Sequence, residues 1–199
     1  MSWKQNINGL ILASKSPRRK EILLGTGIDF IVETVDIGDE YRFFENKEIK
    51  NAIILLAKEK GKFVCEKYPD VPVLSADTVV VLNKNVLGKP KNAADANMML
   101  KMLSGRKHSV YTAVNLACKK INFNENFLQK TDVWFRRIDD NEIEEYLKKA
   151  NFSDKAGGYG IQEDGKYFIE KINGDYSNVM GLPICTTINL LKKYTARIK

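Results

Sequence analysis

Residues 14–19 bring two serines, a proline and two arginines together in an order that could bind an anion. Ser16 is suited to cap a helix and Pro17 to begin it, so the unpaired N–H groups of a first helical turn would follow directly after an apolar strand. Arg18 and Arg19 add positive charge where the helix dipole is already positive, and a bound phosphate would neutralise both. The alternative is an ordinary capped helix whose two arginines face water.

A carboxylate, Asp77, interrupts the most apolar run of the chain, residues 73–82. Burying an unpaired carboxylate is costly, so such a group is normally paired with a cation or holds a metal ion. An aspartate at this place could instead cap a turn at the end of a strand. We favour a functional site at Asp77 over this alternative.

Two lysines also stand in positions that could serve an anion. Lys60 falls on or near the apolar face of a predicted helix over residues 47–68, where its ammonium must extend to solvent or meet an anion. Lys89 stands between Gly88 and Pro90, in stiff backbone just after a predicted hairpin. Taken singly, each of them is a weak indication.

Residues 154–162 read as a loop with three glycines whose backbone could approach a flat ligand closely, without the spacing of a dinucleotide-binding fingerprint or of a Walker loop. Residues 174–183 read as a second loop, which ends at the start of a helix. Either segment could equally be a plain turn.

The composition limits the chemistry and the location of the chain. Its 199 residues carry a net charge of +7, which favours polyanionic partners without choosing among nucleotides, nucleic acid and membrane surfaces. One histidine, His108, excludes most triad and zinc chemistry. No apolar run could span a bilayer and no signal peptide is evident, so we expect a cytoplasmic protein without membrane contact. The cysteines match no metal-site spacing and are expected to be buried free thiols: Cys65, Cys118 and Cys185.

Strands and helices alternate in the first half of the sequence, and strands cluster in the second half. This pattern predicts an α/β fold with a mixed sheet. The expected strands cover residues 10–13, 30–35, 73–76, 79–82, 109–117, 130–135 and 167–172, and helices are expected to begin near residues 17, 47, 92, 139 and 184.

Considered together, these segments resemble one family, the Maf or septum-formation-protein nucleotide pyrophosphatases. The matching segments follow the family's order over nearly the whole chain, as a single domain spanning residues 1–199. The resemblance implies a fold similar to the inosine-triphosphate pyrophosphatases, with a mixed twisted sheet in two lobes around a central cleft. It also implies hydrolysis of a nucleoside triphosphate to the monophosphate and pyrophosphate. The segments are residues 14–19, 76–78, 86–90, 103–105, 154–162 and 174–183.

The same resemblance implies roles for particular residues. Asp77 matches the catalytic carboxylate, a proton acceptor, and is also a predicted ligand of a divalent cation, Mg²⁺ or Mn²⁺. A second acidic residue of the family falls within residues 36–45, where Asp39 aligns without a gap and Glu40 only with one. Asp39 is therefore the second predicted metal ligand. Phosphate contacts are implied for Ser14, Arg19, Lys60 and Lys89.

The resemblance also implies the substrate. Members that prefer dTTP and UTP are similar to this chain at Arg18, Thr78 and Gln162, whereas members that prefer 7-methyl-GTP differ there. The expected partner is thus a pyrimidine nucleoside triphosphate, normal or modified, and a homodimer is left open. The rival hypothesis is a non-catalytic basic regulatory protein that binds nucleic acid or cell-division partners. Against nucleic acid, the chain lacks interleaved aromatic and basic stretches.

Overall fold

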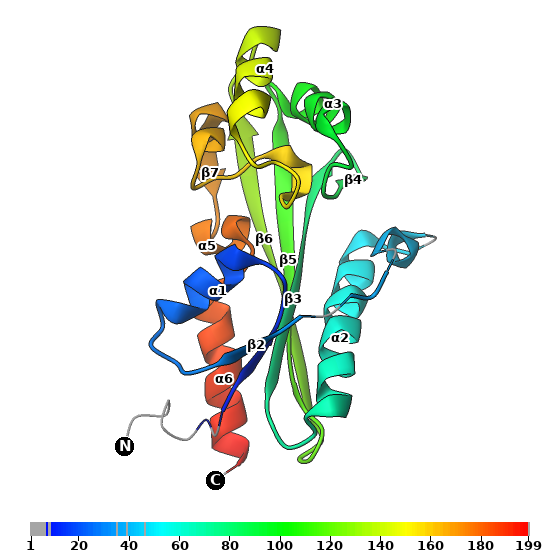
Figure 1. The fold of residues 1–199 in the computed structure, drawn as a ribbon, viewed down its shortest axis with the longest axis vertical. Helices are drawn as coiled ribbons and strands as arrows, with labels where there is room; N and C mark the ends of the chain where they lie inside the picture. The colour runs from blue at the N-terminus through cyan, green and yellow to red at the C-terminus, as the bar shows by residue number, and fades with distance from the viewer. Residues whose placement is uncertain (1–6, 8, 35, 39, 46, 199) are drawn as a thin grey trace. The chain divides into compact units, whose positions relative to one another are not determined.

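A computed structural model describes residues 7, 9–34, 36–38, 40–45 and 47–198, and its ribbon is drawn in Figure 1. Asp39, a predicted metal ligand, lies outside the described residues. The chain divides into two compact units. The first comprises Met1–Asp77, Thr112–Gln129 and Gly181–Lys199, and the second comprises Thr78–Tyr111 and Lys130–Met180.

The strands form a mixed sheet, as the sequence predicts. Their order is β2-β1-β3-β5-β6-β7, and β4 pairs with β3 off this path. The first strand pairs in parallel with β2 and β3, whereas β3–β4 and β6–β7 are antiparallel pairs. The strands are β1 (Ile11–Ala13), β2 (Ile31–Glu33), β3 (Val73–Leu82), β4 (Asn85–Leu87), β5 (Lys107–Cys118), β6 (Phe123–Phe135) and β7 (Ile169–Asn173).

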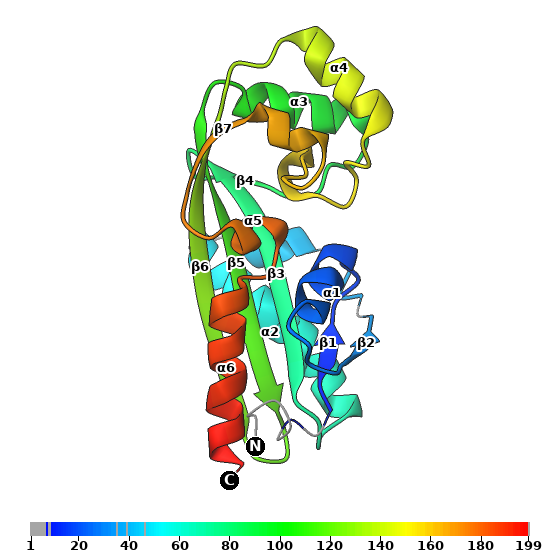
Figure 2. The ribbon, with the colours of Figure 1, turned by 90° about the vertical axis from the view of Figure 1, so that its left-hand side faces the viewer.

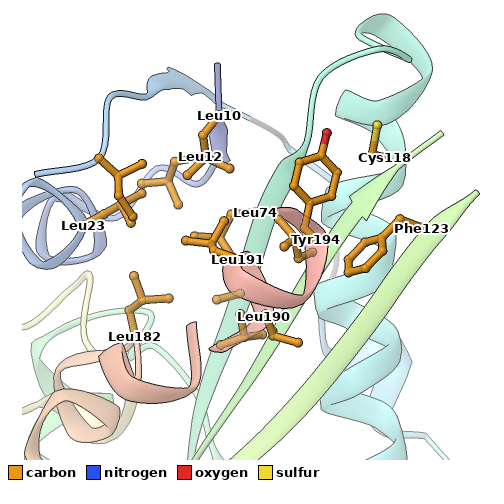
Figure 3. Close-up of a cluster of buried hydrophobic side chains, with 14 residues drawn as sticks. Leu10, Leu12, Leu23, Leu74, Cys118, Phe123, Leu182, Leu190, Leu191 and Tyr194 are labelled. Carbon is orange, nitrogen blue, oxygen red and sulfur yellow. The ribbon is translucent and has the colours of Figure 1, made fainter. Parts of the chain in front are cut away.

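In the first unit, helices cover both faces of the sheet. Successive residues of a strand point to opposite faces, and Leu12 packs in the cluster formed with α1 (Pro17–Leu24) and α6 (Ile184–Arg197). The neighbouring Ile11 packs in the cluster formed with α2 (Ile49–Lys67). Figure 1 shows α2 on one side of β1 and β3, and α1 and α6 on the other. Figure 3 shows leucines of β1, α1 and α6 meeting in the larger cluster.

The second unit has its own apolar core. The helices α3 (Ala93–Leu103) and α4 (Asp140–Lys149) lie side by side in Figure 2 and pack together against strand residues such as Val80 and Phe135. Between β3 and β4 the backbone turns at Asn83 and Lys84, both with positive φ, as a tight hairpin requires. The remaining elements here are α5 (Tyr176–Met180) and the 3₁₀ helices Ala156–Gly158 and Asp164–Phe168, and the first unit has a further 3₁₀ helix, Glu40–Phe44.

Local signals predicted the helix starts correctly. The side chain of Asn92 caps α3, and Asp139 and Glu142 form a capping box at α4. Three expectations were wrong. Asp77 does not interrupt a strand, because β3 runs unbroken from Val73 to Leu82. The strand expected to begin at residue 130 begins at Phe123, as β6. Cys185, expected to be buried, is exposed near the start of α6.

Within the part of the chain that the structure describes, no helix is both long enough and apolar enough to cross a membrane.

Candidate functional site

The turn between β1 and α1 holds the predicted anion-binding segment. The Ser16 side chain accepts a hydrogen bond from the Arg19 backbone N–H at 3.5 Å, and Pro17 is the first helical residue. The Ser16 backbone N–H in turn donates to the hydroxyl of Ser14 at 3.1 Å. The predicted helix cap is therefore confirmed, and the Ser14 hydroxyl contacts the backbone of the capping residue.

Arg19 is buried rather than solvated. Its Nε donates to the carbonyl of Gly181 at 2.8 Å, and one terminal nitrogen donates to the carbonyl of Ala76 at 2.7 Å and to Ser14 Oγ at 3.3 Å. Arg18, the preceding residue, is half-buried. Arg19 thus joins the start of α1 to the strand residue just before Asp77 and to the turn before α6.

Asp77 is buried and meets the predicted lysine. The ammonium of Lys60 lies 2.5 Å from a carboxylate oxygen of Asp77 and 2.6 Å from one of Glu40. The side chains of Lys60 and Asp77 retain only 11% and 7% of their exposure, and that of Glu40 retains 35%. One lysine therefore bridges two carboxylates, and of the two acidic candidates in residues 36–45, Glu40 is the one whose position is described.

A glycine allows α2 to come close enough to β3 for this pairing. A Cβ built on Gly61 would lie 2.7 Å from the Ser75 hydroxyl oxygen, which is too close for a real contact. The Ser75 hydroxyl also links the two elements, because it donates a hydrogen bond to the carbonyl of Ala57 in α2 at 2.7 Å. Sequence reasoning passed over Gly61, although a glycine inside a helix is a recognisable sign of close packing.

The charged groups of this cluster act on one another. Burial lowers the pKa of the Arg19 guanidinium, and the negative charges of Asp77 and Glu40 oppose that lowering. With Lys60, the cluster holds two positive and two negative charges. The neighbouring Arg18 adds a further positive charge that also lowers the pKa of Arg19.

The same carboxylates are the candidate ligands for a divalent cation. Asp77 and Glu40 already converge on one cation, the Lys60 ammonium, and supply hard oxygen donors. Mg²⁺ is typically held by one or two carboxylates together with substrate phosphates rather than by a full protein cage. Two converging carboxylates fit an ion that shares its coordination with a phosphate ligand. Among the described residues no group of three or more histidine, cysteine or acidic side chains could hold a metal ion.

The second unit carries the other three predicted site residues. Thr78 follows Asp77 in β3, so its side chain points to the opposite face of the strand. Lys89 and Gln162 are exposed. Their loops are tied together by backbone, since the N–H of Gly157 donates to the carbonyl of Gly88 at 2.9 Å.

A buried lysine fixes the loop that carries Gln162. The Lys155 ammonium lies 2.9 Å from Asp154 and 3.0 Å from Glu163, and its side chain is 3% exposed. A Cβ on Gly160 would meet this side chain at 2.6 Å, so the loop folds closely around the lysine. Lys155 was within the predicted loop but was not singled out, because nothing local marks it as buried.

The single histidine is structural. His108 Nε2 lies 2.7 Å from the hydroxyl of Tyr159, and its ring packs edge-on against Phe135. Burial lowers the pKa of His108 to about 4, so the ring is neutral at pH 7. Its role is to hold Tyr159, next to the glycines of the loop.

Comparisons with known proteins identify relatives of the chain and of its fold. A dTTP/UTP pyrophosphatase of Geobacillus sp. (strain WCH70) is 42% identical over 184 residues, covering 92% of this chain and 97% of that protein. One of Clostridioides difficile (strain 630) is 43% identical over 187 residues, covering 93% and 94%. The structure of the Staphylococcus aureus Ham1 protein aligns with a TM-score of 0.50 at 12% identity, covering 96% of this chain and 100% of that one, which confirms the fold class.

The strongest evidence of family membership comes from a family model that covers nearly the whole chain. It is described as Maf-like protein and matches residues 9–194, a span that includes every predicted site residue. The chain therefore belongs to the Maf-like protein family.

Proposed function

We propose that the protein is a nucleoside triphosphate pyrophosphatase that hydrolyses dTTP and UTP to the monophosphate and pyrophosphate. The observation that carries this proposal is the cluster in the first unit, where Asp77 and Glu40 share the Lys60 ammonium. The relatives named dTTP/UTP pyrophosphatase, about 40% identical over almost their full length, support the substrate class.

Hydrolysis requires water to attack the α-phosphorus while the bond to the pyrophosphate oxygen breaks. The triphosphate repels the incoming water with its own negative charge, so the site must neutralise that charge and position the water. Asp77 accepts the proton of the water in this proposal, and Arg19 and Lys60 stabilise the phosphates. Ser14 contributes a hydroxyl at the start of α1, where helix N–H groups favour an anion.

Asp77 and Glu40 would hold a divalent cation, Mg²⁺ or Mn²⁺, with substrate phosphates completing its coordination. When bound, such an ion polarises a phosphate and neutralises the leaving pyrophosphate. Asp39, the second ligand that the sequence predicts, lies outside the described residues and stays a prediction.

Selection of the base is assigned in this proposal to Thr78 and Gln162 of the second unit and to Arg18 of the first. Thymine and uracil share a donor, N3–H, flanked by two carbonyl acceptors. The hydroxyl of Thr78, the amide of Gln162 and the guanidinium of Arg18 provide matching donors and acceptors. Lys89, being exposed, is assigned to the phosphates.

The decisive assay follows products rather than loss of substrate. The purified protein should convert dTTP with Mg²⁺ or Mn²⁺ into dTMP and pyrophosphate, resolved by ion-exchange chromatography. Release of dTDP and inorganic phosphate would contradict the reaction class. Absence of any turnover across the nucleotide panel would favour the rival regulatory protein.

A further inference from the structure

We propose that Lys60 is a resident counter-ion: it takes the place of the divalent cation between Asp77 and Glu40 in the ligand-free protein and leaves it when cation and triphosphate bind together. The inference rests on the proposed function, since it concerns the same carboxylates. It adds a residue that keeps metal affinity low until the nucleotide arrives.

The contacts of Lys60 place it where a metal ion would compete with it. Its ammonium is within 2.6 Å of one oxygen from each carboxylate, and its side chain is 11% exposed. The ammonium and a divalent cation would therefore compete for the same carboxylate oxygens. While Lys60 keeps both carboxylate contacts, its ammonium is engaged by them and interacts only weakly with a phosphate.

The charges of the cluster favour binding of the cation together with the triphosphate over binding of the cation alone. Asp77 and Glu40 balance Lys60 and Arg19, and Arg19 is fixed by the carbonyls of Ala76 and Gly181. A divalent cation that entered alone and displaced Lys60 would put two positive charges in place of one, and the excess positive charge in a largely buried cluster is unfavourable. A triphosphate arriving with the cation supplies the missing negative charge and gives the displaced ammonium a new anion.

The packing of α2 lets Lys60 make this exchange without moving the helix. Gly61 sits against Ser75, and the Ser75 hydroxyl is bonded to Ala57, so the backbone beside Lys60 is fixed on β3. The lysine side chain has four rotatable bonds, and only these need to change.

The test measures Mn²⁺ binding to the full-length protein without nucleotide, from the electron paramagnetic resonance signal of the free ion. Lys60→Met keeps the length of the side chain and removes its charge. This variant should bind Mn²⁺ at least about tenfold more tightly than the unmodified protein, equivalent to about 1.4 kcal/mol. Lys60→Gln, whose amide can still donate to a carboxylate, should show the same direction and serves if Lys60→Met does not fold.

Two further variants identify the cause. Lys67→Met removes another ion-paired lysine of α2, an exposed one that pairs with Glu33, and should leave Mn²⁺ affinity unchanged. The double variant Lys60→Met, Glu40→Gln removes one positive and one negative charge, and should lose most of the gain because only Asp77 remains as a charged ligand.

Unchanged or weaker Mn²⁺ binding in folded Lys60→Met and Lys60→Gln would overturn the exchange. If the unmodified protein still released pyrophosphate from dTTP in that case, the proposed function would stand and only the role of Lys60 would fall. If neither pyrophosphate release nor Mn²⁺ binding occurred in any variant, both proposals would fall.

Discussion

The candidate residues of the two units are held in opposite ways. In the first unit the side chains themselves are fixed: Arg19, Lys60 and Asp77 are buried and bonded to defined partners. In the second unit the backbone is fixed, through Gly157 and Gly88, whereas Lys89 and Gln162 are exposed residues. A group that performs chemistry must be preorganised, and a group that recognises a ligand can be ordered by it. The contrast fits the roles proposed for these residues, reaction for Arg19, Lys60 and Asp77 and recognition of the base for Gln162.

The largest effect is expected at Asp77. Asp77→Asn is nearly isosteric but removes the charge that would accept a proton or bind a cation, so kcat should fall at least about a hundredfold. Steady-state pyrophosphate release measures the loss, and circular dichroism checks the fold. Activity within a few-fold of the unmodified protein would show that the carboxylate is not part of the reaction.

Arg19 should combine a catalytic and a structural effect. Arg19→Ala leaves the buried carbonyls of Ala76 and Gly181 without their donor, which should lower the free energy of unfolding by about 2–4 kcal/mol. Turnover should fall for every nucleotide alike. Urea titration followed by kinetics on dTTP and ATP measures both effects. A stable variant with normal turnover would contradict both roles.

Lys89 should separate these effects, because it is exposed and its backbone is held by neighbours. Lys89→Ala should lower kcat/KM for every nucleotide about tenfold to a hundredfold, the worth of one charge-assisted phosphate contact. Its urea midpoint should match that of the unmodified protein. A variant that changed the ranking of bases instead would move Lys89 from the phosphates to the base.

Substitution of Gln162 should give the smallest effect of the four. It should change kcat/KM for ATP little and change the preference among nucleotides. Gln162→Ala removes an amide that pairs with the pyrimidine, so the ratio of kcat/KM for dTTP to that for ATP should fall at least about fivefold. Glu163→Gln, which weakens the Lys155 contact beside it, is the matched test of loop placement and should shift the ratio in the same direction by less. An unchanged ratio in Gln162→Ala would remove the residue from base selection.

Features set by neighbouring residues could be predicted from the sequence, and features set by distant ones could not. The cap at Ser16, the hairpin at Asn83 and the capping box at Asp139 depend on a few adjacent residues. The burial of Arg19 depends on Gly181, which lies 162 residues away. No periodicity signals such a contact.

The site shows the same division. Asp77 was recognisable because a carboxylate in an apolar run needs a partner, yet its partner Lys60 lies 17 residues earlier on another element. From the sequence, Lys60 was only a weak candidate for binding an anion, with no link to Asp77. Helix packing at Gly61 brings the two together, and that close approach depends on Ser75 in the facing strand.

The central claim is that this protein hydrolyses pyrimidine nucleoside triphosphates, with recognition separate from reaction. Comparing kcat/KM for dTTP, UTP, CTP, GTP, ATP and 7-methyl-GTP tests it most directly. A base that leaves buried polar groups unpaired loses roughly 1–3 kcal/mol, so dTTP and UTP should exceed the purine triphosphates by at least about tenfold. Equal turnover of all six, or a preference for 7-methyl-GTP, would contradict the account.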